Sequence, residues 1–293
     1  MDTVLRSRSR TVTIGSEQPF CIIGERINPT GRKSFAEQLR GGDLSTVTVD
    51  AVAQVEAGAD MLDVNAGIPL VDEPELLQNM LRTAQEAVDV PICIDSSVIE
   101  ALEAGLSVYE GRALVNSVTA EDERLEEILP LVARHGAAVI GLANDETGIP
   151  ETAEKRLELA RKIVSAAGDH GIAAADVVID PLAMTVGADT EAVTTTLKAI
   201  RLIREELGVN MCLGASNVSF GLPQRHVLNA AFLPMAMAAG LTSAIMSTAP
   251  PCVEAVRASD LLLGHDPWGA RWIAAHRARQ AAAASEQEAV AAR

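Results

Sequence analysis

The stretch "AVIGLANDETGIPETAEKRLELARKIVSAAGDHGIAAADVVID", residues 138–180, contains one complete unit of strand, helix and strand. Two short apolar runs, Ala138–Leu142 and Val177–Ile179, flank a longer segment, 152–168. In that segment apolar residues recur at spacings of three and four while charged residues fill the opposite face, which predicts an amphipathic helix. The flanking runs are apolar throughout rather than alternating, which is typical of parallel strands buried on both faces.

The same unit repeats along most of the chain. The predicted strands are Phe20–Gly24, Met61–Val64, Ile92–Ile94, Ala113–Val115, Ala138–Leu142, Val177–Ile179, Met211–Leu213 and Ser243–Met246. The predicted helices are 45–57, 74–88, 97–105, 121–135, 152–168, 190–207, 224–239 and 252–264, with Thr152 and Gly168 as expected caps of the fifth. Eight such units in sequence predict a closed (β/α)8 TIM barrel, with an open doubly wound sheet as the alternative.

This pattern places the barrel at residues 20–264 and leaves an N-terminal extension at residues 1–19. Within the extension, Thr11–Ile14 and the following Phe20–Ile23 flank "GSEQP", so we expect a hairpin across the floor of the barrel.

Residues 265–293 form an alanine-rich C-terminal tail, which we expect to be helical and to fray toward its end. Trp268 and Trp272 stand at the i, i+4 spacing of one helical face. That face suits packing against the barrel or against a second subunit.

Composition excludes several classes of function. The 293 residues carry a formal charge of −16, so a phosphate backbone is an unfavourable partner and nucleic-acid binding is not expected. No apolar run approaches the ~18 residues of a membrane span. The basic N-terminus lacks the apolar core of a secretory signal, and its alternating arginines only weakly resemble a transit peptide.

The four cysteines are expected to be buried thiols. Three of them, Cys21, Cys93 and Cys212, stand inside apolar runs, where a thiol behaves as a small hydrophobic group. None pairs with a histidine at the spacing of a zinc site, so we expect no bound metal. Reduced thiols favour the cytoplasm.

Polar side chains gather where the predicted strands end. They are Glu25, Arg26, Asn28, Asp63, Asn65, Asp95, Ser96, Ser97, Asn116, Ser117, Asn144, Asp145, Asp180, Ser216, Asn217, Ser247 and Thr248. Any one of them is explained as a helix cap. Together they place Asp and Asn at one rim of the barrel, where active sites of this fold lie. Lysine is absent from these ends, and so are the glycine-rich phosphate motifs.

A rim rich in carboxylates and amides suits a neutral, amide-rich heterocycle such as a pterin. The pyrimidinone edge of a pterin offers a ring N–H and an amino group side by side, and one carboxylate accepts both. Leaving these donors unpaired in a buried site would cost about 1–3 kcal/mol each. The alternative is a carboxylate site for Mg²⁺ or Ca²⁺.

Seven motifs, each at a strand end, carry a resemblance to a known family. They are "IGERINPTG" (23–31), "GADMLDVNAG" (58–67), "ICIDSS" (92–97), "ALVNSV" (113–118), "GLANDETGIP" (141–150), "VIDPL" (178–182) and "GASNVSFGLPQRHVLNAAFL" (214–233). From about Ile22 to Leu263 the chain resembles the methyltetrahydrofolate:corrinoid methyltransferases. These are pterin-binding barrels related to dihydropteroate synthase and to the folate domain of cobalamin-dependent methionine synthase.

The resemblance implies roles for particular residues. Asp95 and Asp180 would hold the amino-pyrimidinone edge of the pterin, and Asn116 would contact the ring. Asn217 would reach N5, the atom that carries the methyl group, as the catalytic residue. The further candidates for folate binding are Gly214, Ser216, Arg225, Asp63 and Asn65.

The implied activity moves a methyl group between N5 of tetrahydrofolate or 5-methyltetrahydrofolate and the cobalt of a corrinoid. The DxHxxG motif of corrinoid carriers is absent, so the corrinoid belongs to a separate partner protein, and relatives imply a homodimer. Nothing in the sequence decides the direction of transfer or the pathway. The alternatives are a folate-binding barrel without catalysis and a dihydropteroate synthase, although the late strand ends lack the cations that a pyrophosphate requires.

Overall fold

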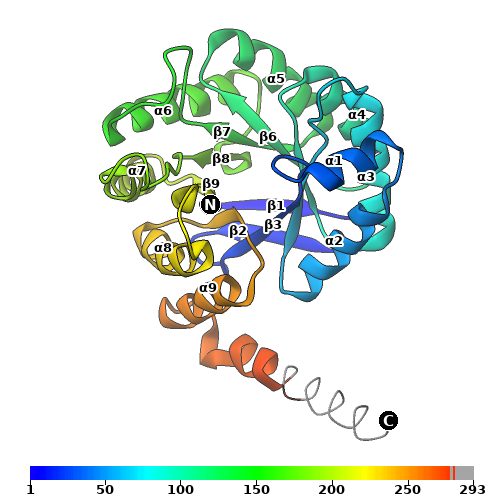
Figure 1. The fold of residues 1–293 in the computed structure, drawn as a ribbon. Helices are drawn as coiled ribbons and strands as arrows, with labels where there is room; N and C mark the ends of the chain where they lie inside the picture. The colour runs from blue at the N-terminus through cyan, green and yellow to red at the C-terminus, as the bar shows by residue number, and fades with distance from the viewer. Residues whose placement is uncertain (278–279, 281–293) are drawn as a thin grey trace, which may run out of the picture.

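The computed structural model describes residues 1–277 and 280 of the chain. Eight parallel strands close into a barrel, because β10 pairs with both β9 and β3. In chain order they are β3 (Cys21–Ile27), β4 (Met61–Asn65), β5 (Ile92–Asp95), β6 (Leu114–Thr119), β7 (Ala138–Leu142), β8 (Val177–Asp180), β9 (Asn210–Gly214) and β10 (Ser243–Met246). Helices surround this barrel (Figure 1). The predicted (β/α)8 barrel is confirmed, and the open sheet is not found.

The helices follow the predicted order, with one addition. They are α1 (Lys33–Arg40), α2 (Ser45–Glu56), α3 (Glu73–Ala87), α4 (Ile99–Val108), α5 (Asp122–His135), α6 (Ala153–Asp169), α7 (Ala192–Glu206), α8 (Arg225–Ala239) and α9 (Pro250–Leu262). Helix α1 was not predicted. It has two turns and buries only Phe35 and Leu39, too few apolar positions to reveal a period.

Helix α6 shows how local sequence sets the boundaries. The Thr152 hydroxyl accepts a hydrogen bond from the Lys155 backbone N–H at 3.3 Å, which confirms the predicted N-cap. Gly168 does not end the helix, which continues to Asp169. The left-handed residue that turns the chain is Gly171, with φ of +76°.

The barrel strands separate two layers of core. Alternate strand residues point inward, where Cys21, Ile23, Met61, Cys93 and Cys212 belong to one cluster. The other strand residues pack against the surrounding helices in a larger cluster. All four cysteines are buried and unpaired, as predicted.

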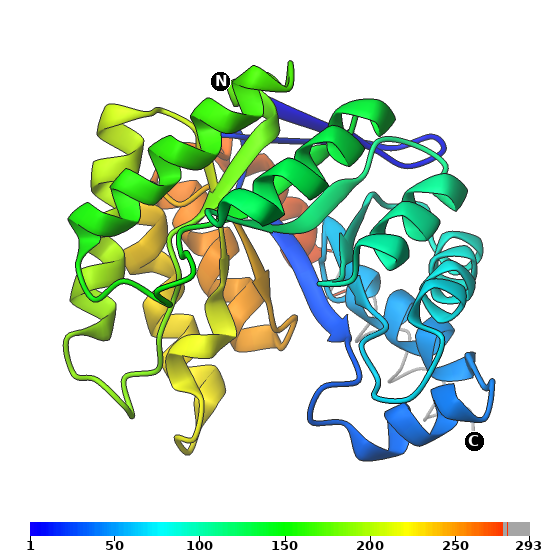
Figure 2. The same cartoon turned by 90° about the horizontal axis from the view of Figure 1, so that it is seen from above.

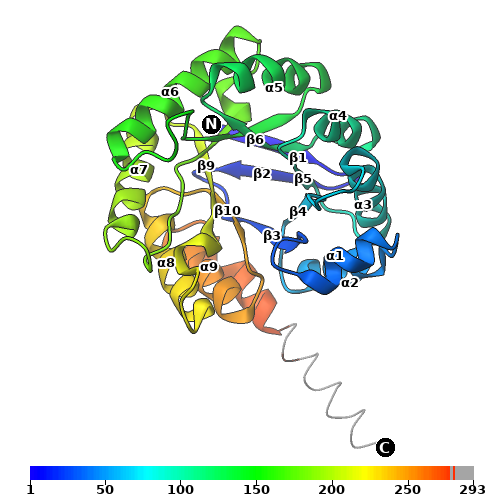
Figure 3. The ribbon, with the colours of Figure 1, turned by 45° about the horizontal axis from the view of Figure 1, so that its top comes forward.

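A β-hairpin seals the N-terminal end of the barrel. It consists of β1 (Asp2–Arg6) and β2 (Thr11–Gly15), paired antiparallel. The predicted pairing of Thr11–Ile14 with Phe20–Ile23 is therefore wrong, because the second segment enters the barrel as β3. Figures 2 and 3 show the hairpin crossing the end of the barrel opposite the loops that follow the strands.

The segment after α9 differs from the predicted tail. Trp268 lies in a 3-10 turn, η3 (Pro267–Gly269), with φ of +62°, and its side chain is 97% exposed. Trp272 lies in the next helical segment, 270–277, so the two tryptophans do not share one helical face. The predicted fraying falls on residues outside those described. No helix of the described residues has the length and apolarity that crossing a membrane requires.

Candidate functional site

Two adjoining cavities lie at the C-terminal mouth of the barrel. The larger has a volume of about 570 Å³ and the smaller about 470 Å³, and they share Glu25, Arg26, Ser216 and Arg225. The larger cavity is also lined by Asn28, Thr30, Gly31, Arg32, Asp63, Asp95, Asn116, Asp180, Gly214, Asn217, Phe220 and Ile245. All candidate residues except Asn65 therefore line one space, although they come from five strands, the 3-10 turn after β9 and the start of α8.

Strand register explains why the acids meet on the floor of the larger cavity. Asn65, Asp95 and Asn116 are register partners on β4, β5 and β6. Asp63 lies two residues before Asn65, so it points the same way from one layer deeper in the barrel and is almost fully buried. The Asn116 side-chain amide donates to Asp63 Oδ1 at 3.2 Å.

Burial makes the carboxyl groups on the floor of the larger cavity weaker acids than an ordinary aspartate. It raises the pKa of Asp95 to about 6, although a hydrogen bond from the Asn65 side chain works in the opposite direction. Burial and the neighbouring charge of Asp95 raise the pKa of Asp63 well above its ordinary value. Two carboxylates this close do not both ionise readily, so the pair accepts a ligand's hydrogen-bond donors while sharing less than two full charges.

Asp180 stands at the end of β8 with both oxygens engaged. Oδ1 accepts from the Leu182 N–H at 2.7 Å and Oδ2 from the Gly214 N–H at 3.3 Å. Burial raises its pKa to about 6, while these two N–H groups and the charge of Arg156 lower it. Arg156, buried in α6, donates to the carbonyls of Pro181 and Leu182 at 2.9 and 2.6 Å. This arginine fixes the turn that carries Asp180.

Asn217 sits on a short 3-10 turn, η2 (Ala215–Ser219), directly after β9. A Cβ atom built on Gly214 would lie 3.0 Å from Asn217 Nδ2, so glycine leaves room for the amide to fold back over the strand end. Among the described residues, none forms a hydrogen bond with the Asn217 side chain. Its amide therefore remains available to a ligand in the larger cavity.

Arg225, the first residue of α8, braces this turn. Its Nε donates to Ser219 Oγ at 3.1 Å and its Nη2 to the Ser216 carbonyl at 2.9 Å. The guanidinium also stacks 4.7 Å from the centre of the Phe220 ring. Arg225 lines both cavities, so it contributes positive charge to the mouth as well as rigidity to the turn.

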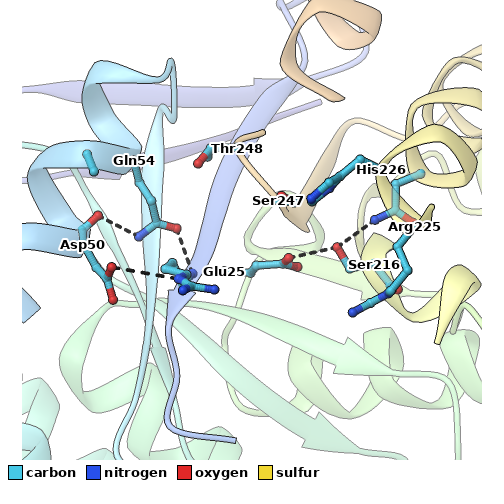
Figure 4. Close-up of a pocket in the computed structure, with 11 residues that line it drawn as sticks. Glu25, Asp50, Gln54, Ser216, Arg225, His226, Ser247 and Thr248 are labelled. Carbon is cyan, nitrogen blue, oxygen red and sulfur yellow. Dashed lines mark hydrogen bonds and ion pairs between the residues drawn. The ribbon is translucent and has the colours of Figure 1, made fainter. Parts of the chain in front are cut away.

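The sequence analysis places Glu25 among the polar side chains at the strand ends but gives it no role in the site. Ser216 Oγ donates to Glu25 Oε1 at 3.0 Å, and Figure 4 shows the two side chains meeting across the mouth from β3 and η2. Arg26 and Arg32, also given no role, line the larger cavity and pair with Asp50 at 3.9 and 2.6 Å. The contact between Glu25 and Ser216 could not be inferred from the sequence, because β3 and η2 lie almost 200 residues apart.

The described residues contain no group of three or more His, Cys, Asp or Glu side chains placed to hold a metal ion. The carboxylates at the mouth are instead paired with amides, a serine or backbone N–H groups. That the protein binds no metal stays a prediction.

Comparison with known proteins places this site in context. A family model described as pterin binding enzyme matches residues 24–247. The methylcorrinoid:tetrahydrofolate methyltransferase of Eubacterium limosum is 36% identical over 252 residues, covering 84% of this chain and 92% of that protein. The methionine synthase of Mycobacterium tuberculosis is 36% identical over 251 residues, 80% of this chain but 21% of that protein, so the chain spans about a fifth of its length.

Solved structures with the same fold include dihydropteroate synthases. The enzyme of Vibrio fischeri superposes with a TM-score of 0.69 at 17% identity, covering 90% of this chain and 100% of that one. A Yersinia pestis DHPS with a pterine-sulfa conjugate gives a TM-score of 0.68 at 16% identity, covering 89% and 99%. At these identities the likeness establishes the fold alone.

Proposed function

Because this chain belongs to the pterin-binding enzyme family, we propose that it transfers a methyl group from a methylated corrinoid to N5 of tetrahydrofolate. The name of the Eubacterium limosum relative supports both the reaction and its direction, since the aligned region covers 92% of that protein. The corrinoid supplies the methyl group and is a substrate carried by a separate protein.

One observation carries this proposal: Asp95, Asn116, Asp180 and Asn217 line a single cavity of about 570 Å³. Ligand sites of roughly 300–1,000 Å³ accommodate small organic molecules, so a pterin fits this space. In the proposed complex, Asp95 and Asp180 accept the ring N–H and amino group of the pyrimidinone edge. Asn116, already held by Asp63, contacts the ring beside them.

The role of Asn217 follows from the chemistry of N5. N5 must present its lone pair to the incoming methyl group and then lose a proton. In the reverse direction it must gain positive character before the methyl group departs. An amide forms hydrogen bonds at N5 without titrating, and a contact made mainly in the transition state raises turnover. The free side-chain amide and its seat over Gly214 support this role.

The proposal has two further parts. Four buried, unpaired thiols favour a reducing compartment, so we place the protein in the cytoplasm. A homodimer is proposed from the family resemblance alone.

The test is direct. The purified protein is mixed with tetrahydrofolate and methylcobalamin, and the cobalamin spectrum is followed while 5-methyltetrahydrofolate is measured by chromatography. We expect coupled loss of methylcobalamin and formation of 5-methyltetrahydrofolate, and Asn217→Ala should slow the reaction about 100-fold. Tight folate binding without transfer would instead identify a non-catalytic folate-binding barrel. Condensation of a pterin pyrophosphate with 4-aminobenzoate would identify a dihydropteroate synthase.

A further inference from the structure

Glu25 is a half-buried acid at the mouth to which the proposed function assigns no role. It lies near the end of β3 and lines both cavities, so it faces the space beside Asn217 and also the smaller cavity. Contacts of the neighbouring residues Gly24 and Arg26 fix its position. Gln54 Oε1 accepts a hydrogen bond from the Arg26 backbone N–H at 2.7 Å, and a side chain on Gly24 would collide with that Gln54 oxygen.

A chain of hydrogen bonds joins Glu25 to η2, the turn that carries Asn217. Asn229 Nδ2 in α8 donates to Ser216 Oγ at 3.3 Å, and Ser216 Oγ donates to Glu25 Oε1 at 3.0 Å. Ser216 precedes Asn217 in η2, so the residue that orients Glu25 shares a turn with the proposed N5 contact. Asn229 is 3% exposed, and its Oδ1 has no hydrogen-bond partner among the described residues. Its Nδ2 instead forms the hydrogen bond to Ser216 Oγ.

The other acids of the cavity are less suited to proton exchange. Both oxygens of Asp180 accept backbone N–H groups, and Asp63 lies below the floor against Asn116. The pterin edge occupies Asp95 in the proposed complex. By contrast, among residues 1–277 and 280 the one side-chain donor to Glu25 is Ser216, through Oε1.

We propose that Glu25 exchanges the N5 proton during the reaction. This proposal rests on the methyl transfer proposed above. When tetrahydrofolate is methylated, the N5 lone pair forms the new N–C bond as the cobalt–methyl bond of the corrinoid substrate breaks, and the electron pair of that bond stays on cobalt as Co(I). N5 then carries hydrogen, methyl and a positive charge. The N–H bond breaks, its electron pair returns to N5, and the proton passes to the Glu25 carboxylate. In the opposite direction the Glu25 carboxyl gives that proton to N5, which becomes the leaving group.

Opposing influences act on the proton affinity of Glu25. Burial raises the pKa of Glu25, while the Ser216 hydrogen bond and the charges of Arg225, His226 and Arg26 lower it. On α9, the Glu25 charge adds to burial in raising the pKa of Cys252 to about 11, so that thiol stays neutral. The smaller cavity provides a path by which Glu25 returns its proton to solvent.

The test compares wild-type protein with Glu25→Gln in single-turnover methylation of tetrahydrofolate by methylcobalamin from pH 5 to 9. Glutamine keeps an oxygen to accept from Ser216 but cannot take a proton. In the wild type the rate should rise as pH rises through the Glu25 pKa, because the carboxylate is the acceptor. In Glu25→Gln the rate should fall about 100-fold and that pH dependence should disappear, with tetrahydrofolate affinity unchanged. Glu126→Gln, at an exposed position on α5, is the control and should match the wild type.

Ser216→Ala provides a second readout that does not depend on loss of the acid. Removing the hydrogen bond that favours ionised Glu25 should move the midpoint of the rate profile to higher pH. A Glu25→Gln protein with the wild-type rate and profile would overturn the role of Glu25. So would a rate loss matched by an equal loss of folate affinity, or an unmoved midpoint in Ser216→Ala. Failure of the wild type to transfer any methyl group would instead overturn the proposed function itself, and this role with it.

Discussion

At the scale of single residues, burying an ionisable carboxyl on the floor of the larger cavity lowers the free energy of unfolding at pH values where that carboxyl is ionised. Asp95 has a pKa of about 6 in the folded protein because burial opposes its charge. In the unfolded chain an aspartate has a pKa of about 3.9. The protonated carboxyl of Asp95 therefore favours the folded state. Its contribution to the free energy of unfolding is fully present below about pH 4 and is lost as pH rises through about 6.

We therefore expect Asp95→Asn to raise the free energy of unfolding by about 1–3 kcal/mol at pH 8 and by little near pH 4. The same substitution should weaken tetrahydrofolate binding, because the amide no longer accepts both pyrimidinone donors. Urea unfolding at the two pH values and calorimetric folate titration measure the two effects. Asp169→Asn, at an exposed position, should change stability by less than about 0.5 kcal/mol. A destabilised Asp95→Asn protein at pH 8 would contradict the assignment.

Gly214 is a second case in which one residue decides the site. Its φ is −68°, so alanine fits the backbone, but the new Cβ would lie 3.0 Å from Asn217 Nδ2 and displace that amide. Gly214→Ala should lower the methyl-transfer rate at least about tenfold while folding normally. Gly168→Ala in α6 is the matched control, since a Cβ there meets nothing within 4 Å. Equal rates in the two variants would show that Asn217 need not fold over the strand end.

At the scale of elements, what the sequence could predict depends on how local the signal is. Every barrel strand was predicted because each is a buried apolar run between helical periods, and Asp or Asn at most of the strand ends marked the mouth. The hairpin partner of β2 could not be inferred, because β1 (DTVLR) has only two apolar residues, whereas the apolar start of β3 follows β2 closely. Glu25 was recognised at the rim but given no role, because its contact with Ser216 comes from the opposite wall.

The hairpin is tied down by polar contacts as well as by packing. Asn210, buried at the start of β9, donates to Thr3 Oγ1 at 2.9 Å and to the Ile14 carbonyl at 2.8 Å. Thr3 Oγ1 donates in turn to the Ala175 carbonyl. Leu5 and Ile14 join the apolar cluster inside the barrel. The hairpin is thus part of the barrel core.

Thr3→Val keeps the shape of the side chain but leaves Asn210 and Ala175 without this partner. The free energy of unfolding should fall by about 1–3 kcal/mol, with folate affinity and transfer rate unchanged because the mouth lies at the far end. Thr11→Val, at an exposed position of β2, is the control and should have little effect. Chemical denaturation of both variants decides the matter. A change in transfer rate without a change in stability would mean that the hairpin communicates with the mouth.

At the scale of the whole molecule, the two ends of the barrel are specialised differently. The N-terminal end is closed by the hairpin, whereas loops ring the mouth (Figure 2). Some of these loops carry exposed apolar side chains. Leu70 follows β4, Ile149 follows β7 and Phe220 follows η2, and each is at least 46% exposed. Exposed apolar groups around a polar opening are typical of a protein-binding surface. Under the proposed function, a corrinoid-carrying partner would approach this face, because the proposed N5 site lies beneath it.

The double variant Leu70→Ser, Ile149→Ser should therefore raise the KM for a corrinoid protein about tenfold, the effect of losing about 1.4 kcal/mol of contact. Transfer from free methylcobalamin should not change, since neither residue lines a cavity. Leu262→Ser is the matched control, because Leu262 is 85% exposed at the end of α9, away from these loops. Parallel kinetics with free and protein-bound corrinoid separate docking from chemistry. If the double variant and the control behave alike with the protein-bound substrate, the partner reaches N5 without using this apolar rim.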